Sequence, residues 1–339
     1  LQGETTSNYY GVALASGDFN GDGKTDLVAG AYGYRSNKGR AYLYTFNDGV
    51  ITGETSSQFG ISLVSGDFNA DGKTDLAVGA IAAATNGRAY VFYNDGLNYP
   101  IAATSADAIV TGEAGGYFGA SVAAGDFNQD GKTDLAVGAY GYSSFAGRAY
   151  IFYNGSITTE NASGADIFIT GEAAGNYFGT TLASGDFNAD GKTDLAASAI
   201  EFSSSAGRTY IFYGGSIITE NASGADIRIT GEAGSYFGWS IDSNDFNADG
   251  KTDLVVGAPA YVSTTYIGRA YIFYNGSIVT EAATGADIII TGEAVGDNFG
   301  QSLASGDFDA DGKTDLAVGA YGYASGAGRT YIFYGGSII

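Results

Sequence analysis

Hydrophobic residues in this chain come in short runs that are separated by polar, glycine-rich segments. In one clear example, residues 117–124 lead into a polar loop, and residues 135–140 form a run of small and β-branched residues. A turn rich in Gly and Ser follows at 141–147, and then an aromatic and β-branched run at 148–153. Residues 165–170 alternate apolar and polar side chains with a period of two. Together these runs predict four short β-strands.

The same pattern recurs six times along the 339 residues, and successive polar loops begin 49, 59, 60, 59 and 62 residues apart. Self-similarity at such a period indicates a repeat architecture. Helical spacing is not found over a convincing length, and 55 glycines disfavour long helices. Four strands per repeat are compatible with a solenoid, with a string of independent hairpin modules, or with a β-propeller.

A propeller suits the repeat best, because an inner strand of Gly, Ala and Ser fits the tight space near a central axis. We therefore predict an all-β fold: a six-bladed β-propeller of four-stranded antiparallel blades, with residues 1–339 as a single domain. The phenylalanine after the first aspartate of each polar loop is expected to turn into the core between blades. These residues are Phe19, Phe68, Phe127, Phe187, Phe246 and Phe308.

The two ends of the chain suggest how the blades close into a ring. The sixth repeat stops at residues 335–339 without a fourth strand, while the chain opens with Leu1-Gln2-Gly3-Glu4. That opening matches the end of a fourth strand such as residues 51–54. We hypothesise that the N-terminal segment pairs with the last blade and completes it, which would remove exposed strand edges. A fragment of a longer array is the competing interpretation.

The polar loops share the pattern D-x-[ND]-x-D-G-x-x-D. Oxygen-bearing side chains at positions 1, 3, 5 and 9, with a backbone carbonyl at position 7, are ligands that Ca²⁺ prefers. Glycine at position 6 allows the positive φ that bends the chain around an ion. The predicted ligands are Asp18, Asn20, Asp22, Lys24 and Asp26 (loop 18–26); Asp67, Asn69, Asp71, Lys73 and Asp75 (67–75); Asp126, Asn128, Asp130, Lys132 and Asp134 (126–134); Asp186, Asn188, Asp190, Lys192 and Asp194 (186–194); Asp245, Asn247, Asp249, Lys251 and Asp253 (245–253); and Asp307, Asp309, Asp311, Lys313 and Asp315 (307–315).

Calcium binding explains these loops better than a simple polar turn does. A turn that only bonds its own backbone does not require aspartate at both position 5 and position 9 of every copy. An EF-hand would need flanking helices and Glu at position 12, which are absent from the sequence pattern. We predict about six structural Ca²⁺ ions, bound with dissociation constants on the order of 10⁻⁴ to 10⁻³ M, as in extracellular modules.

Composition narrows the function further. The formal net charge is −22, but about half of the 37 acidic residues sit in the six loops, so most of the acidity is assigned to metal binding. The chain has no His, Cys or Met, which excludes disulfides, soft-metal sites and Ser-His or Cys-His nucleophiles. No apolar run reaches the length of a membrane span. No basic patch is present for nucleic acid.

The order of these motifs resembles the FG-GAP repeat of the integrin α-subunit N-terminal propeller. Phe118-Gly119 precedes the loop at 126–134, and Gly138-Ala139 follows it; the fifth repeat reads Phe237-Gly238 and then Gly257-Ala258-Pro259. The resemblance implies calcium loops on one face of the blades and a protein or glycan ligand on the opposite face. It also implies an extracellular or cell-surface location. Integrin-like propellers usually have seven blades, of which only some carry the loop, whereas all six repeats carry it here.

A non-catalytic recognition or adhesion module is therefore the function we predict. The periodic glutamates Glu4, Glu54, Glu113, Glu172, Glu232 and Glu293 are each matched by one Gly-Arg arginine, which favours a repeated structural pair over catalytic acids. Two alternatives stay open: a lectin with sugar sites between blades, and an accessory domain of a larger secreted hydrolase.

A ligand site is expected where the repeats differ most. The fifth repeat has the only tryptophan, Trp239, and a longer loop at 260–268 that includes Tyr261. The fourth repeat has Glu201-Phe202 where most others have Tyr-Gly. These four residues form the candidate ligand face, although Trp239 also suits packing near the inner strand. We expect the chain to be a monomer.

Overall fold

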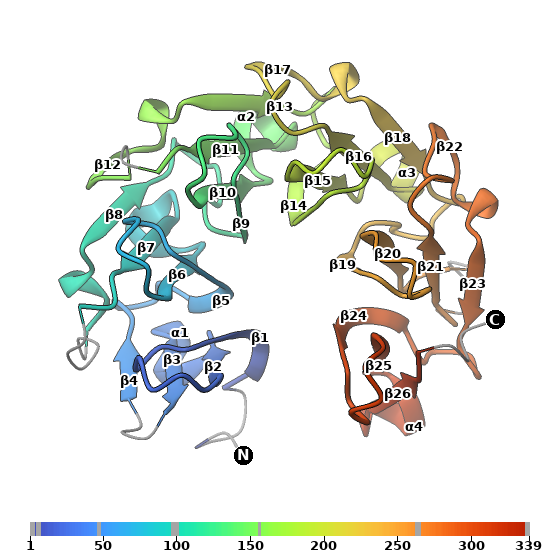
Figure 1. Cartoon of the computed structure of the whole chain (residues 1–339), viewed down its shortest axis with the longest axis horizontal. Coiled ribbons are helices and arrows are strands. Elements are labelled where there is room, and N and C mark those ends of the chain that lie inside the picture. Colours follow the sequence, from blue (N-terminus) through green and yellow to red (C-terminus); the bar gives the residue numbers. More distant parts are fainter. Residues whose placement is uncertain are drawn as a thin grey trace. The chain divides into compact units, whose positions relative to one another are not determined.

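The computed structural model describes residue 4 and residues 8–45, 49–95, 102–154, 157–261 and 266–335. These residues form six sheets, one for each sequence repeat (Figure 1). The chain divides into two compact units: residues 1–170 with 218–220, and residues 171–217 with 221–339. Among the described residues, no helix is long and apolar enough to cross a lipid bilayer.

The first unit contains three sheets. Sheet one consists of β1 (Tyr10–Gly17), β2 (Asp26–Ala31), β3 (Arg40–Tyr44) and β4 (Gly49–Thr52). Sheet two consists of β5 (Phe59–Gly66), β6 (Asp75–Ala80), β7 (Arg88–Phe92) and β8 (Ala108–Thr111), with the short β12 (Glu160–Asn161) parallel to β8. Sheet three consists of β9 (Ser121–Gly125), β10 (Asp134–Ala139), β11 (Arg148–Phe152) and β13 (Ile167–Thr170), followed by β17 (Glu220–Asn221).

The second unit contains the other three sheets. Sheet four consists of β14 (Phe178–Gly185), β15 (Asp194–Ala199), β16 (Arg208–Phe212), β18 (Ile227–Thr230) and the short β22 (Glu281–Ala282). Sheet five consists of β19 (Ser240–Asn244), β20 (Asp253–Ala258), β21 (Arg269–Phe273) and β23 (Ile288–Thr291). Sheet six consists of β24 (Phe299–Gly306), β25 (Asp315–Ala320) and β26 (Arg329–Phe333).

The four strands of each complete sheet are antiparallel and follow chain order. In sheet three, Leu135 of β10 pairs with Ala124 of β9 and with Phe152 of β11, and Arg148 of β11 pairs with Thr170 of β13. This confirms the predicted fold class, an all-β six-bladed propeller. Sheet six has three strands in the described part of the chain. The expected completing segment, Leu1 to Gly3, lies outside the described residues, so ring closure and a single domain over 1–339 stay predictions.

In the described part of the chain, helical structure is confined to single turns. Five of them join the second and third strands of a sheet: α1 (Tyr34–Asn37), α2 (Tyr142–Phe145), α3 (Phe202–Ser205), α4 (Tyr323–Gly326) and, in sheet two, η1 (Ala83–Thr85). Their inner residues are left-handed, as at Ser143 (φ 49°) and Ser144 (φ 56°), a conformation that residues other than glycine rarely adopt. The remaining turns are η2 (Ala103–Ser105), η3 (Ala162–Gly164), η4 (Ala222–Gly224) and η5 (Ala283–Gly285).

The core of each unit lies between neighbouring sheets. In the first unit, Phe68, Ala77 and Val91 of the second repeat pack against Leu135 and Phe152 of the third. Strand residues alternate between the two faces, so each sheet contributes one apolar layer to each neighbour. The equivalent layers meet between sheets one and two, four and five, and five and six.

The loop phenylalanines follow the prediction with one exception. Five of them are at most 2% exposed, namely Phe19, Phe68, Phe127, Phe187 and Phe246. Phe308 is 48% exposed, which corrects the expectation for the sixth repeat. The reason is local, because no further sheet among the described residues of the second unit covers that face of sheet six.

Candidate metal centres

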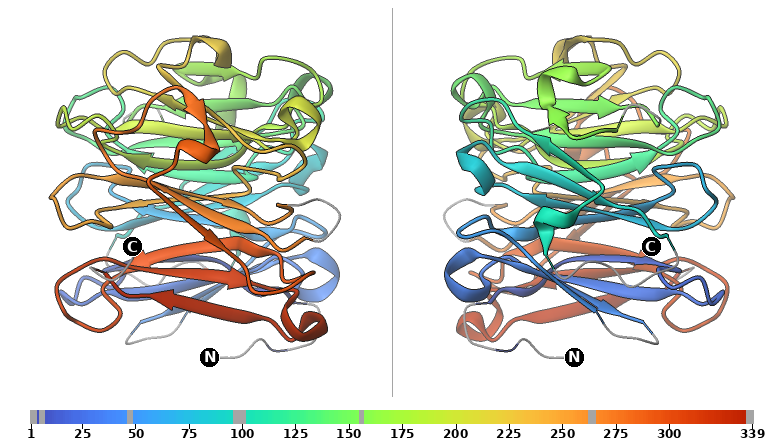
Figure 2. Two further views of the ribbon diagram at one scale, coloured as in Figure 1. Left: turned by 90° about the vertical axis from the view of Figure 1, so that its right-hand side faces the viewer. Right: turned by 90° about the vertical axis from the view of Figure 1, so that its left-hand side faces the viewer.

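Each polar loop connects the first strand of a sheet to the second, at the end opposite the connection between the second and third strands. Figure 2 shows this for sheet six, coloured red, where the α4 turn and the loop at 307–315 lie at opposite ends of the strands. Because the strands are antiparallel, the segments before the first strand and after the second strand share the end with the helical turn. The loops and the candidate ligand residues therefore occupy different ends of each sheet.

The loop backbone is wound tightly around its own carboxylates. In the second loop, the carboxylate oxygens of Asp67 accept hydrogen bonds from the backbone N–H of Asp71 (3.0 Å) and Gly72 (2.8 Å). Asn69 Oδ1 accepts from Asp71 N–H (2.9 Å), and Asp71 Oδ1 accepts from Lys73 N–H (2.9 Å). Gly72 has φ 83°, as predicted for position 6. The same bonds recur in all six loops.

The aspartate at position 9 is buried in five of the six loops, and Asp26 of the first loop is partly buried. Asp75 is fully buried at the start of β6, where its two oxygens accept from the backbone N–H of Phe68 (2.8 Å) and Asn94 (2.7 Å). Burial raises the pKa of Asp75 to about 6, although these two hydrogen bonds oppose the shift. Burial likewise raises the pKa of Asp134, Asp194 and Asp253 to about 6. A cation beside these carboxylates would favour their charged form.

Some side chains of the predicted ligand sets lie close together in the first and sixth loops, and the full sets stay predictions. Asn20 Nδ2 lies 3.5 Å from Asp22 Oδ2 and 3.4 Å from Asp26 Oδ1. In the sixth loop, where position 3 is also an aspartate, Asp307, Asp309 and Asp315 each offer a carboxylate oxygen within 4.8 Å of the others. Oxygens that bind one Ca²⁺ at 2.3–2.6 Å lie at most about 5 Å apart, so this donor set fits the ion.

Position 7 is a lysine in all six loops. The lysine side chains extend outward but in three loops approach the position-5 aspartate, as in Lys73–Asp71 (3.9 Å) and Lys192–Asp190 (3.5 Å). These lysine side chains are about 40% exposed, so the ion pairs are weak. An ammonium group can therefore move away when a divalent ion takes the carboxylate.

The periodic glutamates are structural partners of the next repeat, as the sequence predicted. Glu54 accepts hydrogen bonds from Arg88 Nη1 (2.5 Å) and from Tyr90 Oη (2.6 Å). The same pairing joins Glu4 to Arg40, Glu113 to Arg148, Glu172 to Arg208, Glu232 to Arg269 and Glu293 to Arg329. Sequence reasoning missed the tyrosine, although it stands two residues after every one of these arginines.

The candidate ligand residues lie at the other end of the sheets. Phe202 and Tyr261 stack on the guanidinium groups of Arg208 and Arg269, at 3.7 and 3.4 Å from the ring centroids. Glu201 Oε2 accepts a hydrogen bond from Ser205 Oγ (2.5 Å) within the same turn. Trp239 is 38% exposed and packs edge-on against Tyr236 at 6.0 Å. The four residues belong to two sheets, and a shared ligand surface for them stays a prediction.

Comparison with known proteins extends the sequence resemblance. The FG-GAP repeat matches residues 10–44, 59–92, 118–152, 178–212, 237–273 and 299–333, which together exceed half of the chain. The chain belongs to the FG-GAP repeat family. Every one of its calcium-type loops lies inside one of these six FG-GAP matches.

Several relatives of this FG-GAP chain are integrin α subunits. It is 32% identical over 169 residues to integrin alpha-5 of Xenopus laevis, covering 47% of this chain and 15% of that protein. It is 34% identical over 183 residues to integrin alpha-PS2 of Drosophila melanogaster, covering 50% and 12%. It is 39% identical over 119 residues to human integrin alpha-IIb, covering 32% and 11%. The chain thus spans only a small part of the relatives it matches.

Proposed function

We propose that this FG-GAP chain is a calcium-loaded, non-catalytic recognition or adhesion module that works outside the cell. The observation that carries the proposal is the repeated donor set: in every repeat an aspartate at position 9, buried in five of the six repeats, belongs to the same tightly wound loop as the oxygen donors at positions 1, 3 and 5. Similarity to integrin α subunits, which are cell-surface proteins, supports the location and the recognition role.

In this proposal, bound calcium would stabilise the folded chain. In each repeat an ion would join the end of the first strand, through positions 1 to 5, to the start of the second, through position 9. It would also neutralise loop carboxylates that repel one another; in the sixth loop three of them lie within 4.8 Å of each other. Six divalent ions would add twelve positive charges to a chain whose formal net charge is −22. Sites with millimolar dissociation constants fill only where calcium is abundant, as it is outside cells.

Most carboxylates of the chain already have structural partners, so few are available as catalytic groups. Glycoside hydrolysis, the chemistry of the hydrolase alternative, needs two carboxyl groups that flank one bond. The loop aspartates bond their own backbone, and the six periodic glutamates bond arginines. We therefore assign no reaction to the chain.

Calcium titration tests the metal part of the proposal. Isothermal titration of the chelator-treated chain should show about six ions per chain. The melting temperature should rise between excess chelator and millimolar calcium. Equal melting temperatures in the two conditions would contradict a structural role of the ions. Recognition can be tested separately, by cell attachment to surfaces coated with the calcium-loaded chain and with the chelated chain.

Sugar binding is a second candidate, because flat aromatic pairs are exposed away from the calcium loops. Tyr9 is 57% exposed and stacks on Tyr32 at 4.7 Å, and Tyr117 is 40% exposed and stacks on Tyr140 at 5.0 Å. A stacked ring presents an apolar face on which the C–H face of a sugar can pack. A glycan array, probed with the native chain and with Tyr117→Ala, tests this role.

A further inference from the structure

The asparagine that follows the third strand of several repeats connects two neighbouring polar loops. In the third repeat, the backbone N–H of Asn154 donates to Oδ1 of Asp134, the position-9 residue of its own loop, at 2.8 Å. Its side-chain Nδ2 donates to the backbone carbonyl of Asp67, position 1 of the preceding loop, at 3.1 Å. The same Nδ2 lies 3.2 Å from the carbonyl oxygen of Thr133. One residue is therefore hydrogen-bonded to members of two different predicted ligand sets.

The shortest of these side-chain bonds belongs to Asn275, inside the second unit. Its backbone N–H donates to Oδ1 of Asp253 at 2.8 Å. Its Nδ2 donates to the carbonyl of Asp186 at 2.7 Å and to that of Thr252 at 3.1 Å. The residue is only 7% exposed, and a buried amide that loses a hydrogen-bond partner costs free energy. The bonds of Asn275 therefore hold the main chains of the fourth and fifth loops in a defined relation.

The first unit contains a further link of this kind, between its first and second loops. The backbone N–H of Asn94 donates to Oδ1 of Asp75 at 2.7 Å, and Asn94 Nδ2 lies 3.5 Å from the carbonyl oxygen of Asp18. These links join loops one, two and three within the first unit, and loops four and five within the second. The three bridging asparagines are Asn94, Asn154 and Asn275.

Repeats four and six have glycine at the bridging position. Gly214 N–H donates to Asp194 Oδ1 at 2.7 Å, and Gly335 N–H donates to Asp315 Oδ1 at 2.7 Å. The fold therefore accepts glycine here, and the bond to position 9 does not require an asparagine side chain. What the side chain adds is the bond to the preceding loop.

A packing contact also brings neighbouring loops together. Thr252 occupies position 8 of the fifth loop, and its methyl carbon would lie 2.8 Å from a Cβ added to Gly185, the residue directly before the fourth loop. Thr133 packs in the same way on Gly66, directly before the second loop. A shift in the main chain of one loop therefore changes the surroundings of the next loop.

We propose that the bridging asparagines couple neighbouring calcium loops, so that a filled loop raises the affinity of the loop next to it. This inference rests on the calcium binding proposed above. A filled loop holds its positions 1 and 9 in place, and with them one acceptor of the bridging asparagine. The adjacent loop then loses less conformational freedom when it closes on its own ion. Two sites coupled in this way typically change each other's affinity by about fivefold or more.

The fourth and fifth loops provide the test, because the amide signals of the position-6 glycines report each loop separately by NMR. Gly250 N–H donates to Asp245 at 2.8 Å, so its signal should follow calcium binding at the fifth loop. Asp186→Ala combined with Asp190→Ala removes two predicted ligands of the fourth loop but keeps the backbone carbonyl of residue 186. This pair should weaken calcium binding at the fifth loop by at least about fivefold. In the Asn275→Gly background the same pair should change that affinity by less than about twofold.

Asn154→Gly is the matched control. It removes the bridging side chain between the second and third loops and leaves the one between the fourth and fifth loops in place. The effect of the emptied fourth loop on the fifth should therefore persist in this variant. Circular dichroism and melting curves in millimolar calcium check that each variant is folded, as expected for a residue that repeats four and six already have.

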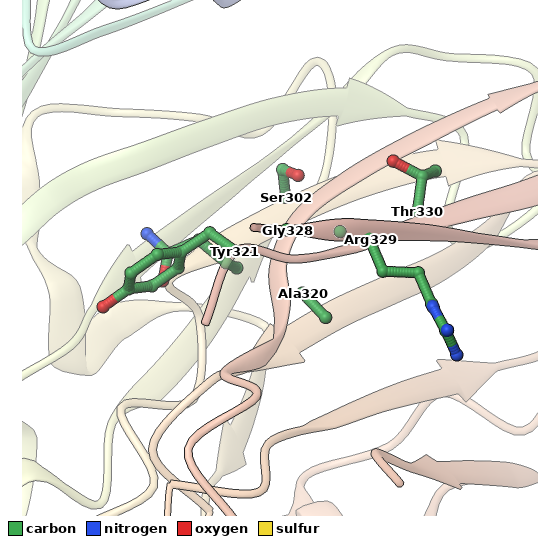
Figure 3. A pocket seen from close by; sticks show the side chains of 8 residues that line it. Ser302, Ala320, Tyr321, Gly328, Arg329 and Thr330 are labelled. Carbon is green, nitrogen blue, oxygen red and sulfur yellow. The ribbon is translucent and has the colours of Figure 1, made fainter. Parts of the chain in front are cut away.

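A second control lies at the other end of the sheets. Ser302, Gly319, Ala320 and Thr330 line a pocket of about 350 Å³ next to the α4 turn, away from the calcium loop of sheet six (Figure 3). Thr330→Ala changes only that end of the sheet. The effect of the emptied fourth loop on the fifth should remain in full.

The outcomes separate this inference from the proposed function. A Gly250 signal that does not respond to calcium would contradict the proposed calcium binding, and the coupling with it. A normal calcium response that is independent of the fourth loop would overturn the coupling alone. An effect of the fourth loop that is equally large in Asn275→Gly, or that disappears in Asn154→Gly, would overturn the role assigned to Asn275.

Discussion

Arg148 donates a hydrogen bond from Nη1 to Oε2 of Glu113 at 3.1 Å, and so links the third strand of sheet three to the end of sheet two. Tyr150 Oη donates to the same oxygen at 2.7 Å, and Tyr142 stacks on the guanidinium group at 3.7 Å. The arginine and glutamate side chains are only 18% and 30% exposed. A charged pair in such surroundings contributes more than a surface ion pair.

Replacing this arginine should therefore destabilise the fold. We expect Arg148→Ala to lower the free energy of unfolding by about 1–3 kcal/mol, since it leaves a half-buried carboxylate with one partner fewer. The equivalent Arg329–Glu293 pair of sheet six is 40% and 58% exposed, so Arg329→Ala is a matched control with a much smaller expected effect. Urea unfolding at saturating calcium measures both. Equal losses of unfolding free energy for the two variants would show that the contribution of the ion pair to stability does not depend on its burial.

The carboxyl group of Asp242 should make the stability of the fold depend on pH. It occupies a position held by Ala or Val in the other five repeats, and burial raises the pKa of its carboxyl group, against hydrogen bonds from Ser305 and Ser243. The folded chain therefore holds this proton more tightly than the unfolded chain. Its contribution to stability is greatest below the ordinary aspartate pKa and is lost as the pH rises through the folded value.

Asp242→Asn mimics the neutral acid and should be more stable than the native chain at pH 7. The advantage should shrink as the pH falls towards 4, where the native carboxyl group is itself protonated. Melting curves between pH 4 and 8 at constant calcium test this, with Asp242→Ala as a second variant that restores the residue type of the other repeats. A native chain that is more stable than Asp242→Asn at pH 7 would contradict the assigned direction.

The sixth calcium loop is predicted to bind the ion most tightly. It has Asp309 at position 3, where the other five loops have asparagine, so it offers four carboxylates to one ion. Ligand charge is one of the properties that set calcium affinity. Asp309→Asn should weaken this single site on the order of tenfold, and Asn128→Asp should strengthen the third site. Competition titration against a chromophoric chelator compares the two variants; an isotherm unchanged by Asp309→Asn would count against the loop as a ligand set.

The sequence alone predicts those features of the molecule that recur in every repeat. The loops, the four strands and the glutamate–arginine pairs recur with the period of the repeat, so the periodicity of the sequence predicts them. Whether a given side chain is buried depends instead on whether a neighbouring sheet covers it, which the repeat pattern does not encode. Phe308 and Phe246 have similar sequence contexts, yet among the described residues of the second unit only Phe246 meets a following sheet. Phe202 and Tyr261 look like departures from the pattern, but their rings fill a stacking position that only the folded turn reveals.

The stacking of Phe202 on Arg208 leads to a prediction that distinguishes a structural role of Phe202 from a role in ligand binding. The ring of Phe202 lies 3.7 Å from the Arg208 guanidinium carbon, where Tyr34, Tyr142 and Tyr323 stand on the arginines of other repeats. Phe202→Ala should lower stability by about 0.5–2 kcal/mol through the lost cation–π contact, and Phe202→Tyr should keep it.

The adjacent Glu201 provides the control. Its carboxylate bonds only within its own turn among the hydrogen bonds described for it, so Glu201→Gln should leave the melting temperature nearly unchanged. If the two residues instead act as a ligand surface, both Phe202→Tyr and Glu201→Gln would reduce binding on a glycan array or in the cell-attachment assay while the melting temperature stays constant. Phe202→Ala alone cannot make this distinction, because a loosened turn would weaken both stability and binding. The pair of conservative variants therefore decides whether this turn only supports Arg208 or also contacts a partner.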